Sequence, residues 1–206
     1  MGQVQERPRS YGIWIALAIV VIIAIAIGAT YNSLVTLDQA VQAQWAQVEN
    51  QYQRRADLVP NLVATVKGVA NFEKSTYIAV AQARASVGQL SPQVVQNAAN
   101  DPNAMAQFQK AQNNLGSALS RLLVTVENYP DLKANENFLT LQSQLEGTEN
   151  RISVERRRYN ELAQAFNTKR NTFPTAMIAG IFGSRFATKS YFQAQPGSQT
   201  APKVTF

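Results

Sequence analysis

Three carboxylates lie within the stretch ENYPDLKANENF, residues 127–138. They are Glu127, Asp131 and Glu136, and a fold that brought Glu49 or Asp57 close would enlarge the group. Carboxylate oxygens are the ligands that hard cations prefer, and paired acids can also do acid–base chemistry. The stretch is therefore a candidate metal or catalytic site. The competing interpretation is a corner between two helices, in which proline and acid start the second helix.

The composition argues against chemistry at this stretch. The chain has 206 residues and contains neither cysteine nor histidine, which removes thiol nucleophiles, disulfides, thiolate zinc sites and imidazole bases. Di-metal sites in helical bundles usually use Glu-x-x-His pairs. A carboxylate-only site and a serine–lysine pair stay open, but no spacing points to either. The sequence predicts a protein that is not an enzyme, with no catalytic, cofactor-binding or metal residues.

An uncharged apolar run, GIWIALAIVVIIAIAIGA, occupies residues 12–29. With its flanks it reaches about twenty residues, the length that crosses a bilayer core of about 30 Å. Tyr11, Trp14 and Tyr31 stand at its edges, where aromatic rings favour the membrane interface. A buried core helix usually keeps a polar stripe, and a cleaved signal peptide has an apolar region of only about 7–15 residues. The run predicts a transmembrane signal anchor over residues 12–30.

The charges beside this run predict its orientation. Arg7 and Arg9 precede it, and no lysine or arginine follows until Arg54. The positive-inside rule places residues 1–11 in the cytoplasm and the rest of the chain in the periplasm or outside the cell. The sequence predicts a single-pass protein of the bacterial inner (cytoplasmic) membrane, and the absence of cysteine suits an oxidising compartment without proving it.

The rest of the chain has helical periodicity. Apolar residues from Leu34 to Tyr52 recur every three or four positions and continue the span as a stalk. Three further amphipathic helices are predicted at 58–87, 104–127 and 131–168, and a loop at 88–103 allows one short helical turn. The fold class is all-α: an up-and-down antiparallel four-helix bundle over residues 31–170, followed by a basic aromatic tail over 171–206.

Two corners are predicted at the membrane-distal end of this bundle. Pro60 is tolerated only in a first helical turn and Asp57 is a good N-cap, so a break is expected near 55–57. The alternative is a single helix kinked at Pro60, which leaves three long helices. At the second corner, Asn128 caps the fourth helix, whose first turn holds Pro130 and Asp131.

If the two corners are neighbours, the arginines of the first reach the acids of the second. The predicted structural corner comprises Arg54, Arg55, Asp57, Pro60, Asn128, Pro130, Asp131 and Glu136. These roles explain the acids without a metal. The run of arginines at 156–158 shares its helix with Glu149, Glu155 and Glu161, a spacing that predicts a solvated, salt-bridged face.

Three long motifs resemble those of the LemA family. They are residues 31–73, from YNSLVTLDQA to VANFE; residues 127–167, from ENYPDLKANENF to LAQAFN; and FPTAMIAGIFG with the terminal APKVTF. The resemblance covers about residues 31–206, and only 86–105 look individual. It implies a small bacterial membrane protein with one N-terminal helix and a helical bundle, and it brings no catalytic residues. Some members accompany envelope metalloproteases, and a relative takes part in magnetosome membrane formation.

The tail is basic and aromatic. No acid follows Glu161, whereas five lysines and arginines do. Its candidate contact residues are Phe173, Met177, Ile181, Phe182, Arg185, Phe186, Lys189, Tyr191 and Phe192. Three interpretations stay open: packing on its own bundle, contact with anionic lipid, and a subunit interface. Nucleic acid is an improbable partner, because the topology is extracytoplasmic and no binding motif is present.

Together these observations predict a membrane-anchored envelope scaffold without a cofactor, one that organises or remodels membrane and associates with itself. Its expected partners are the lipid bilayer and a second copy of the chain. The alternative is an adaptor or binding module for an envelope protease or signalling complex.

Overall fold

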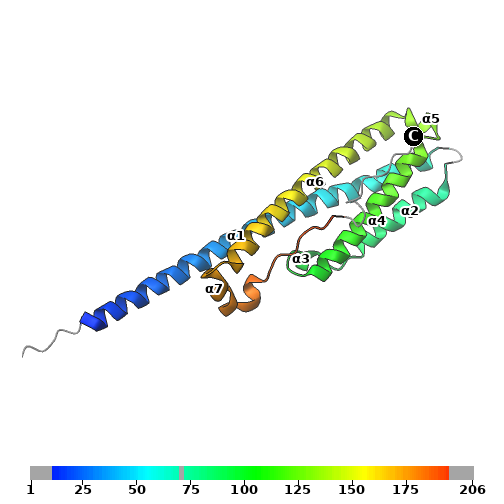
Figure 1. Ribbon diagram of the computed structural model, residues 1–206. Coiled ribbons are helices and arrows are strands. Elements are labelled where there is room, and N and C mark those ends of the chain that lie inside the picture. The colour runs from blue at the N-terminus through cyan, green and yellow to red at the C-terminus, as the bar shows by residue number, and fades with distance from the viewer. Residues whose placement is uncertain (1–10, 70–71, 195–206) are drawn as a thin grey trace, which may run out of the picture.

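The structure is a computed structural model that describes residues 11–69 and 72–194. It is all-α, as the sequence predicts (Figure 1). The elements in chain order are α1 (Tyr11–Lys67), α2 (Lys74–Gly88), α3 (Pro92–Asn97), α4 (Pro102–Val126), α5 (Pro130–Lys133), α6 (Glu136–Asn171), α7 (Thr175–Ile181) and the short 3-10 helix η1 (Gly183–Phe186).

Helix α1 joins two different environments without a break. It has 57 residues, which at 1.5 Å per residue makes a rod of about 85 Å. Residues 11–29 are exposed on every side and carry no charge, whereas from Leu34 one stripe is buried against the bundle. In the described part of the chain, α1 is the one helix long and apolar enough to cross a membrane.

The second half of α1 and helices α2, α4 and α6 form the antiparallel bundle. Helix α1 packs chiefly against α6, α2 packs against α4, and α2 also contacts α1 (Figure 1). One core cluster lies around Trp45, Phe108 and Tyr159, toward the apolar half of α1. A second cluster fills the distal end around Leu62 and Leu122.

The predicted break near residues 55–57 is wrong, because α1 continues through Pro60 as the single-helix alternative requires. Proline has no N–H, so the carbonyl of Ala56 loses its helical partner. The Nε of Arg84, on α2, donates to this carbonyl at 3.1 Å. A tertiary contact thus replaces the missing hydrogen bond. Asp57 caps nothing, and its carboxylate accepts from Gln53 one turn earlier, at 2.8 Å.

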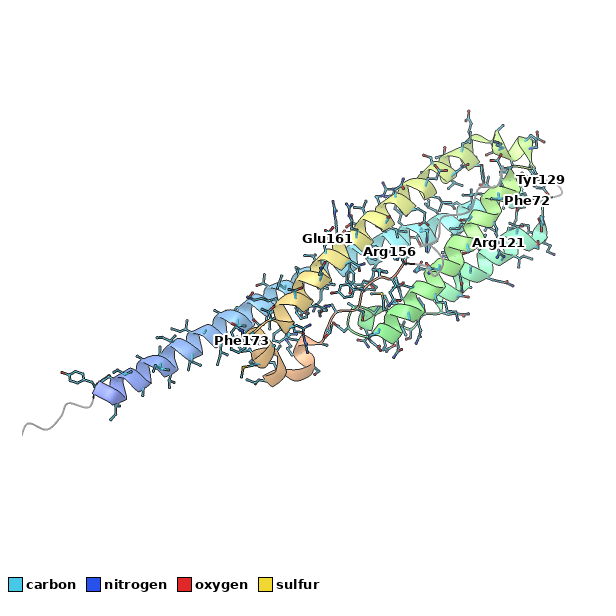
Figure 2. The ribbon with its side chains drawn as sticks, in the orientation of Figure 1. Phe72, Arg121, Tyr129, Arg156, Glu161 and Phe173 are labelled. Carbon is cyan, nitrogen blue, oxygen red and sulfur yellow. The ribbon has the colours of Figure 1, made fainter. Side chains whose placement is uncertain are left out.

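Instead, α1 ends at Lys67 and α2 begins at Lys74, so the first corner falls within the helix predicted at 58–87. The second occupies residues 127–135 and contains α5, so the long helix α6 begins at Glu136. The predicted cap Asn128 is replaced by Asn135, whose side chain accepts from the Phe138 N–H at 3.1 Å. The two corners do meet, since the rings of Phe72 and Tyr129 lie 4.9 Å apart (Figure 2).

Candidate functional site

The predicted ion pairs between the two corners do not form as expected. Arg55 is 4% exposed, and its Nη1 contacts the Oε1 of Glu149 on α6 at 2.6 Å. Its Nη2 donates to the backbone and side-chain oxygens of Gln112 on α4, at 2.9 and 2.7 Å. Arg55 therefore ties α1, α4 and α6 together, and its predicted pairing with Asp131 or Glu136 is corrected.

The acids of the second corner remain at the surface. Glu127 pairs with Lys133, while Asp131 and Glu136 are exposed in the first turns of α5 and α6. Acidic side chains there interact favourably with the helix dipole. Within residues 11–69 and 72–194 no group of three His, Cys, Asp or Glu side chains is placed to hold a metal ion.

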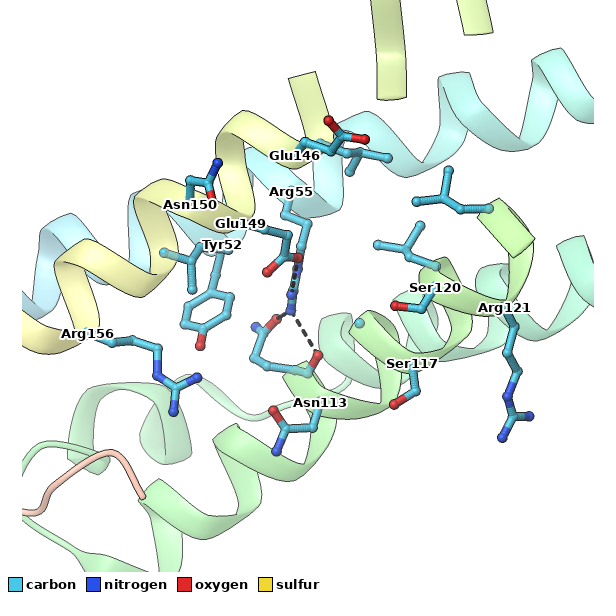
Figure 3. Close-up of a pocket in the computed structure, with 16 residues that line it drawn as sticks. Tyr52, Arg55, Asn113, Ser117, Ser120, Arg121, Glu146, Glu149, Asn150 and Arg156 are labelled. Carbon is cyan, nitrogen blue, oxygen red and sulfur yellow. Dashed lines mark hydrogen bonds and ion pairs between the residues drawn. The ribbon is translucent and has the colours of Figure 1, made fainter. Parts of the chain in front are cut away.

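Arg55 lies on the floor of an open polar groove between α4 and α6. The groove has a volume of about 820 Å³, and Figure 3 shows the side chains that line it. Gly116 adjoins the guanidinium, and a Cβ there would lie 3.6 Å from its Nη1, an ordinary van der Waals contact. Burial raises the pKa of the Tyr52 phenol, while the positive charges of Arg156 and Arg55 oppose this in part. The phenol thus stays neutral and can both donate and accept hydrogen bonds.

The groove walls carry amides, hydroxyls and charges of both signs, which suits hydrogen bonding to a polar chain rather than acid–base chemistry. They include Asn113, Ser117, Ser120 and Arg121 from α4 and Glu146, Asn150 and Arg156 from α6 (Figure 3).

Residues 187–194, named here the strap, run extended beside α6. Asn167 accepts from the Lys189 N–H at 2.8 Å and donates to its carbonyl at 2.9 Å. Asn160 likewise accepts from the Phe192 N–H at 2.9 Å and donates to the Phe192 carbonyl at 3.0 Å. The two asparagines are seven helical residues apart, a rise of about 10.5 Å. Lys189 and Phe192 are three extended residues apart, about 10 Å, so the two spacings match. The strap is thus bound antiparallel to α6.

A buried ion pair holds the strap to α1. Lys189 is 3% exposed and Asp38 is 2% exposed, and the Lys189 Nζ also contacts the Oδ1 of Asn100 at 2.7 Å. The same ammonium lies 4.9 Å from the centre of the Phe166 ring. Removing one partner of such a pair would leave an uncompensated charge in the core.

Three residues predicted to contact membrane or another subunit are buried. Phe186, Lys189 and Phe192 are buried inside the protein, so they pack on their own bundle. The Phe192 ring lies 5.7 Å from Trp45 and 5.5 Å from Tyr159.

The remaining tail candidates are exposed. Phe173, Met177 and Ile181 are 77%, 66% and 76% exposed and follow one another every four residues. With Phe182, which is 40% exposed, they are named here the apolar stripe. The opposite face of α7 is buried. The stripe thus remains available for lipid or for another subunit.

Arg185 and Tyr191 are exposed as well. The guanidinium of Arg185 lies 5.9 Å from the centre of the Phe186 ring. The Tyr191 hydroxyl accepts from the Nδ2 of Asn167 at 2.9 Å, so that side chain is part of the strap.

Sequence reasoning missed Asp38, Asn160 and Asn167, although a signal for them exists. Asp38 falls on the buried stripe of α1, four residues after Leu34 and three before Val41. A charge on an apolar face predicts a buried partner. Arg55 fits the same rule, since it follows Tyr52 by three residues and precedes Val59 by four.

The sequence of the matched region decides the family. The LemA family profile matches residues 44–206. The chain belongs to the LemA family. The magnetosome protein MamQ 2 of Paramagnetospirillum magneticum is 28% identical over 223 residues, covering 98% of this chain and 81% of that protein. MamQ of Magnetospirillum gryphiswaldense matches with the same identity and coverage. Protein LemA of Metamycoplasma hominis is 24% identical over 148 residues, covering 72% of this chain and 63% of that protein.

The family profile and the MamQ alignments cover different parts of the chain. The LemA profile begins at residue 44, beyond the apolar run, and takes in the polar groove, the strap and the apolar stripe. The MamQ alignments cover 98% of the chain, so they include most of the apolar half of α1 as well. The resemblance predicted from the motifs is confirmed.

Proposed function

We propose that this LemA family protein is a membrane-anchored, non-enzymatic scaffold of the bacterial envelope that associates with itself. The continuity of α1 carries the proposal. Its exposed apolar half is long enough to cross a bilayer, and its other half forms part of the bundle core. No linker separates the two halves, so the bundle is held rigidly at a fixed height above the membrane.

A rigid connection suits an organising role better than a tethered catalytic one. Flexible linkers let a domain sample the space around its anchor, whereas a continuous helix projects its bundle in one direction. Three relatives are named for the magnetosome, and a scaffold fits the assembly of such a structure. The distribution of arginines near the span supports an N-terminus in the cytoplasm and a bundle on the opposite side.

Cross-linking of the intact protein in native membranes, followed by mass spectrometry, tests the proposal. A scaffold gives a ladder of homomeric products at low cross-linker concentration. Exclusive formation of one product with a foreign protein would contradict self-association.

The polar groove favours a second candidate, an adaptor for an envelope protease or signalling complex. A cleft of about 820 Å³ with amides and hydroxyls on both walls can bind an extended peptide as the strap is bound. For an adaptor, Ser117→Trp should abolish the foreign cross-link by filling the groove. For a scaffold, the same substitution should leave the homomeric ladder unchanged.

A further inference from the structure

The apolar stripe lies at the level where the apolar half of α1 ends. Tyr31 directly follows the end of that half, and its ring lies 4.8 Å from Phe182 and 5.4 Å from Phe186. Phe173 lines one open cleft together with Thr30. Because α1 is a single helix here, the stripe has a fixed height relative to the span.

We propose that the apolar stripe enters the headgroup layer of the membrane from which α1 emerges, and that nearby cations select anionic phospholipid. This rests on the proposed function, because it requires that α1 spans the bilayer. The exposed apolar run from residue 12 to residue 29 rises about 27 Å, close to the thickness of the hydrocarbon core. Thr30 and Tyr31 then lie at the interface, and the stripe beside them lies there too.

Two cations lie close to the stripe. Lys169 lines the cleft that holds Phe173 and Thr30, and Arg185 lies over the ring of Phe186. Glu161 lines the far end of that cleft, eight residues or about 12 Å farther along α6. Asp38, an acid on α1, is buried against Lys189. Cations at a membrane surface attract anionic headgroups.

A bilayer fits this surface better than a second copy of the chain. A stable protein interface buries about 800 Å² on each partner, more than four side chains supply. Symmetric pairing of two stripes would also bring Lys169 and Arg185 close to their own copies, and like charges oppose association. A few aromatic and aliphatic side chains suffice at a membrane to which the protein is already tethered.

Spin labelling of the full-length protein in vesicles tests the inference. The chain has no cysteine, so Met177→Cys, Ile22→Cys and Val124→Cys each give one labelling site. Val124 is the control, because it is apolar and 71% exposed but lies at the distal end of α4. Vesicles contain phosphatidylcholine with or without phosphatidylglycerol. Relaxation by oxygen, which concentrates in lipid, is compared with relaxation by a water-soluble nickel complex.

The label at 177 is expected to show a higher oxygen-to-nickel ratio than the label at 124. Phosphatidylglycerol should raise the ratio further, and Lys169→Gln combined with Arg185→Gln should remove that additional rise. Equal ratios at 177 and 124, with a lipid signal retained at 22, would overturn the inference alone. An aqueous signal at 22 would overturn the proposed function. Protection of the label at 177 from both oxygen and nickel would show a second copy on the stripe and would overturn the inference. If phosphatidylglycerol still raised the oxygen-to-nickel ratio in the double variant, selection of anionic lipid by Lys169 and Arg185 would be refuted.

Discussion

The strap and the apolar stripe belong to one basic aromatic tail but have opposite environments. In the strap, Lys189 and Phe192 are buried, and side chains of α6 bind their backbone. In the stripe, Phe173, Met177 and Ile181 point their apolar groups outward. Both parts contain aromatic side chains, and neither contains an acid. The two parts differ in the hydrogen-bond and ion-pair partners that the bundle provides. The strap is bound by asparagines of α6 and by a buried aspartate of α1.

Loss of the buried cation should have the largest effect. Lys189→Met removes the partner of Asp38, which leaves a carboxylate uncompensated in the core at a cost of about 3–5 kcal/mol. Thermal and denaturant unfolding of the full-length protein in detergent, followed by circular dichroism, measures this. Lys169→Met is the matched control, because Lys169 is exposed. Equal stability of the two variants would show that the strap is not anchored by its ion pair.

Loss of an asparagine bound to the strap should have an intermediate effect. Asn167→Ala removes the two hydrogen bonds to the Lys189 backbone, each worth a net of about 0.5–1.5 kcal/mol. Limited proteolysis should then cut within residues 187–194 before it cuts the bundle. Asn150→Ala, at an exposed position on the same helix, should change neither stability nor cleavage. A cut that appears first in α7 would contradict the account.

Substitution in the stripe should barely change the stability of the fold. Met177→Ser and Ile181→Ser alter exposed side chains, and such changes usually stay within about 0.5 kcal/mol. Denaturant unfolding in detergent measures the effect. A loss as large as that of Asn167→Ala would mean that the stripe packs on the bundle, and the difference between the two parts of the tail would disappear.

The smallest effect on stability is expected at Glu49. Its carboxyl interacts with Trp45, whose ring in turn packs on Phe192 of the strap. Burial raises the pKa of the Glu49 carboxyl, and the indole N–H of Trp45 opposes this in part. A carboxyl with a raised pKa binds its proton more tightly in the folded state, so stability is lost as pH rises through that pKa. Glu49→Gln should therefore stabilise the protein slightly at pH 7 and less at pH 4. Denaturant titrations at the two pH values measure this, and the reverse order would contradict burial as the cause.

The sequence predicts the helices of this molecule better than their tertiary connections. Helical periodicity placed α4 and most of α6 close to their observed bounds, because repeating apolar faces depend only on local spacing. The break predicted near Pro60 was wrong, because the hydrogen bond that proline removes from α1 is replaced by one from Arg84 on another helix. No local rule anticipates a donor 28 residues away.

The candidate site was predicted less well for the same reason. Arg55 was expected to meet an acid, and it does, but its partner is Glu149 instead of Asp131 or Glu136. The burial of Lys189 follows from Asp38 on a distant helix. The sequence does place Asp38 and Arg55 on apolar helix faces. Buried charges of this kind require a partner, but helical periodicity does not identify which residue it is.

Hydrogen exchange of the full-length protein in lipid nanodiscs tests most directly whether the tail consists of two independent parts. Peptides covering residues 187–194 are expected to exchange as slowly as those of α6. Asn167→Ala should accelerate exchange in the strap and leave residues 173–182 unchanged. Rapid exchange in the unmodified strap, or equal acceleration of both segments in the variant, would contradict the division of the tail into a bound strap and an outward-facing stripe.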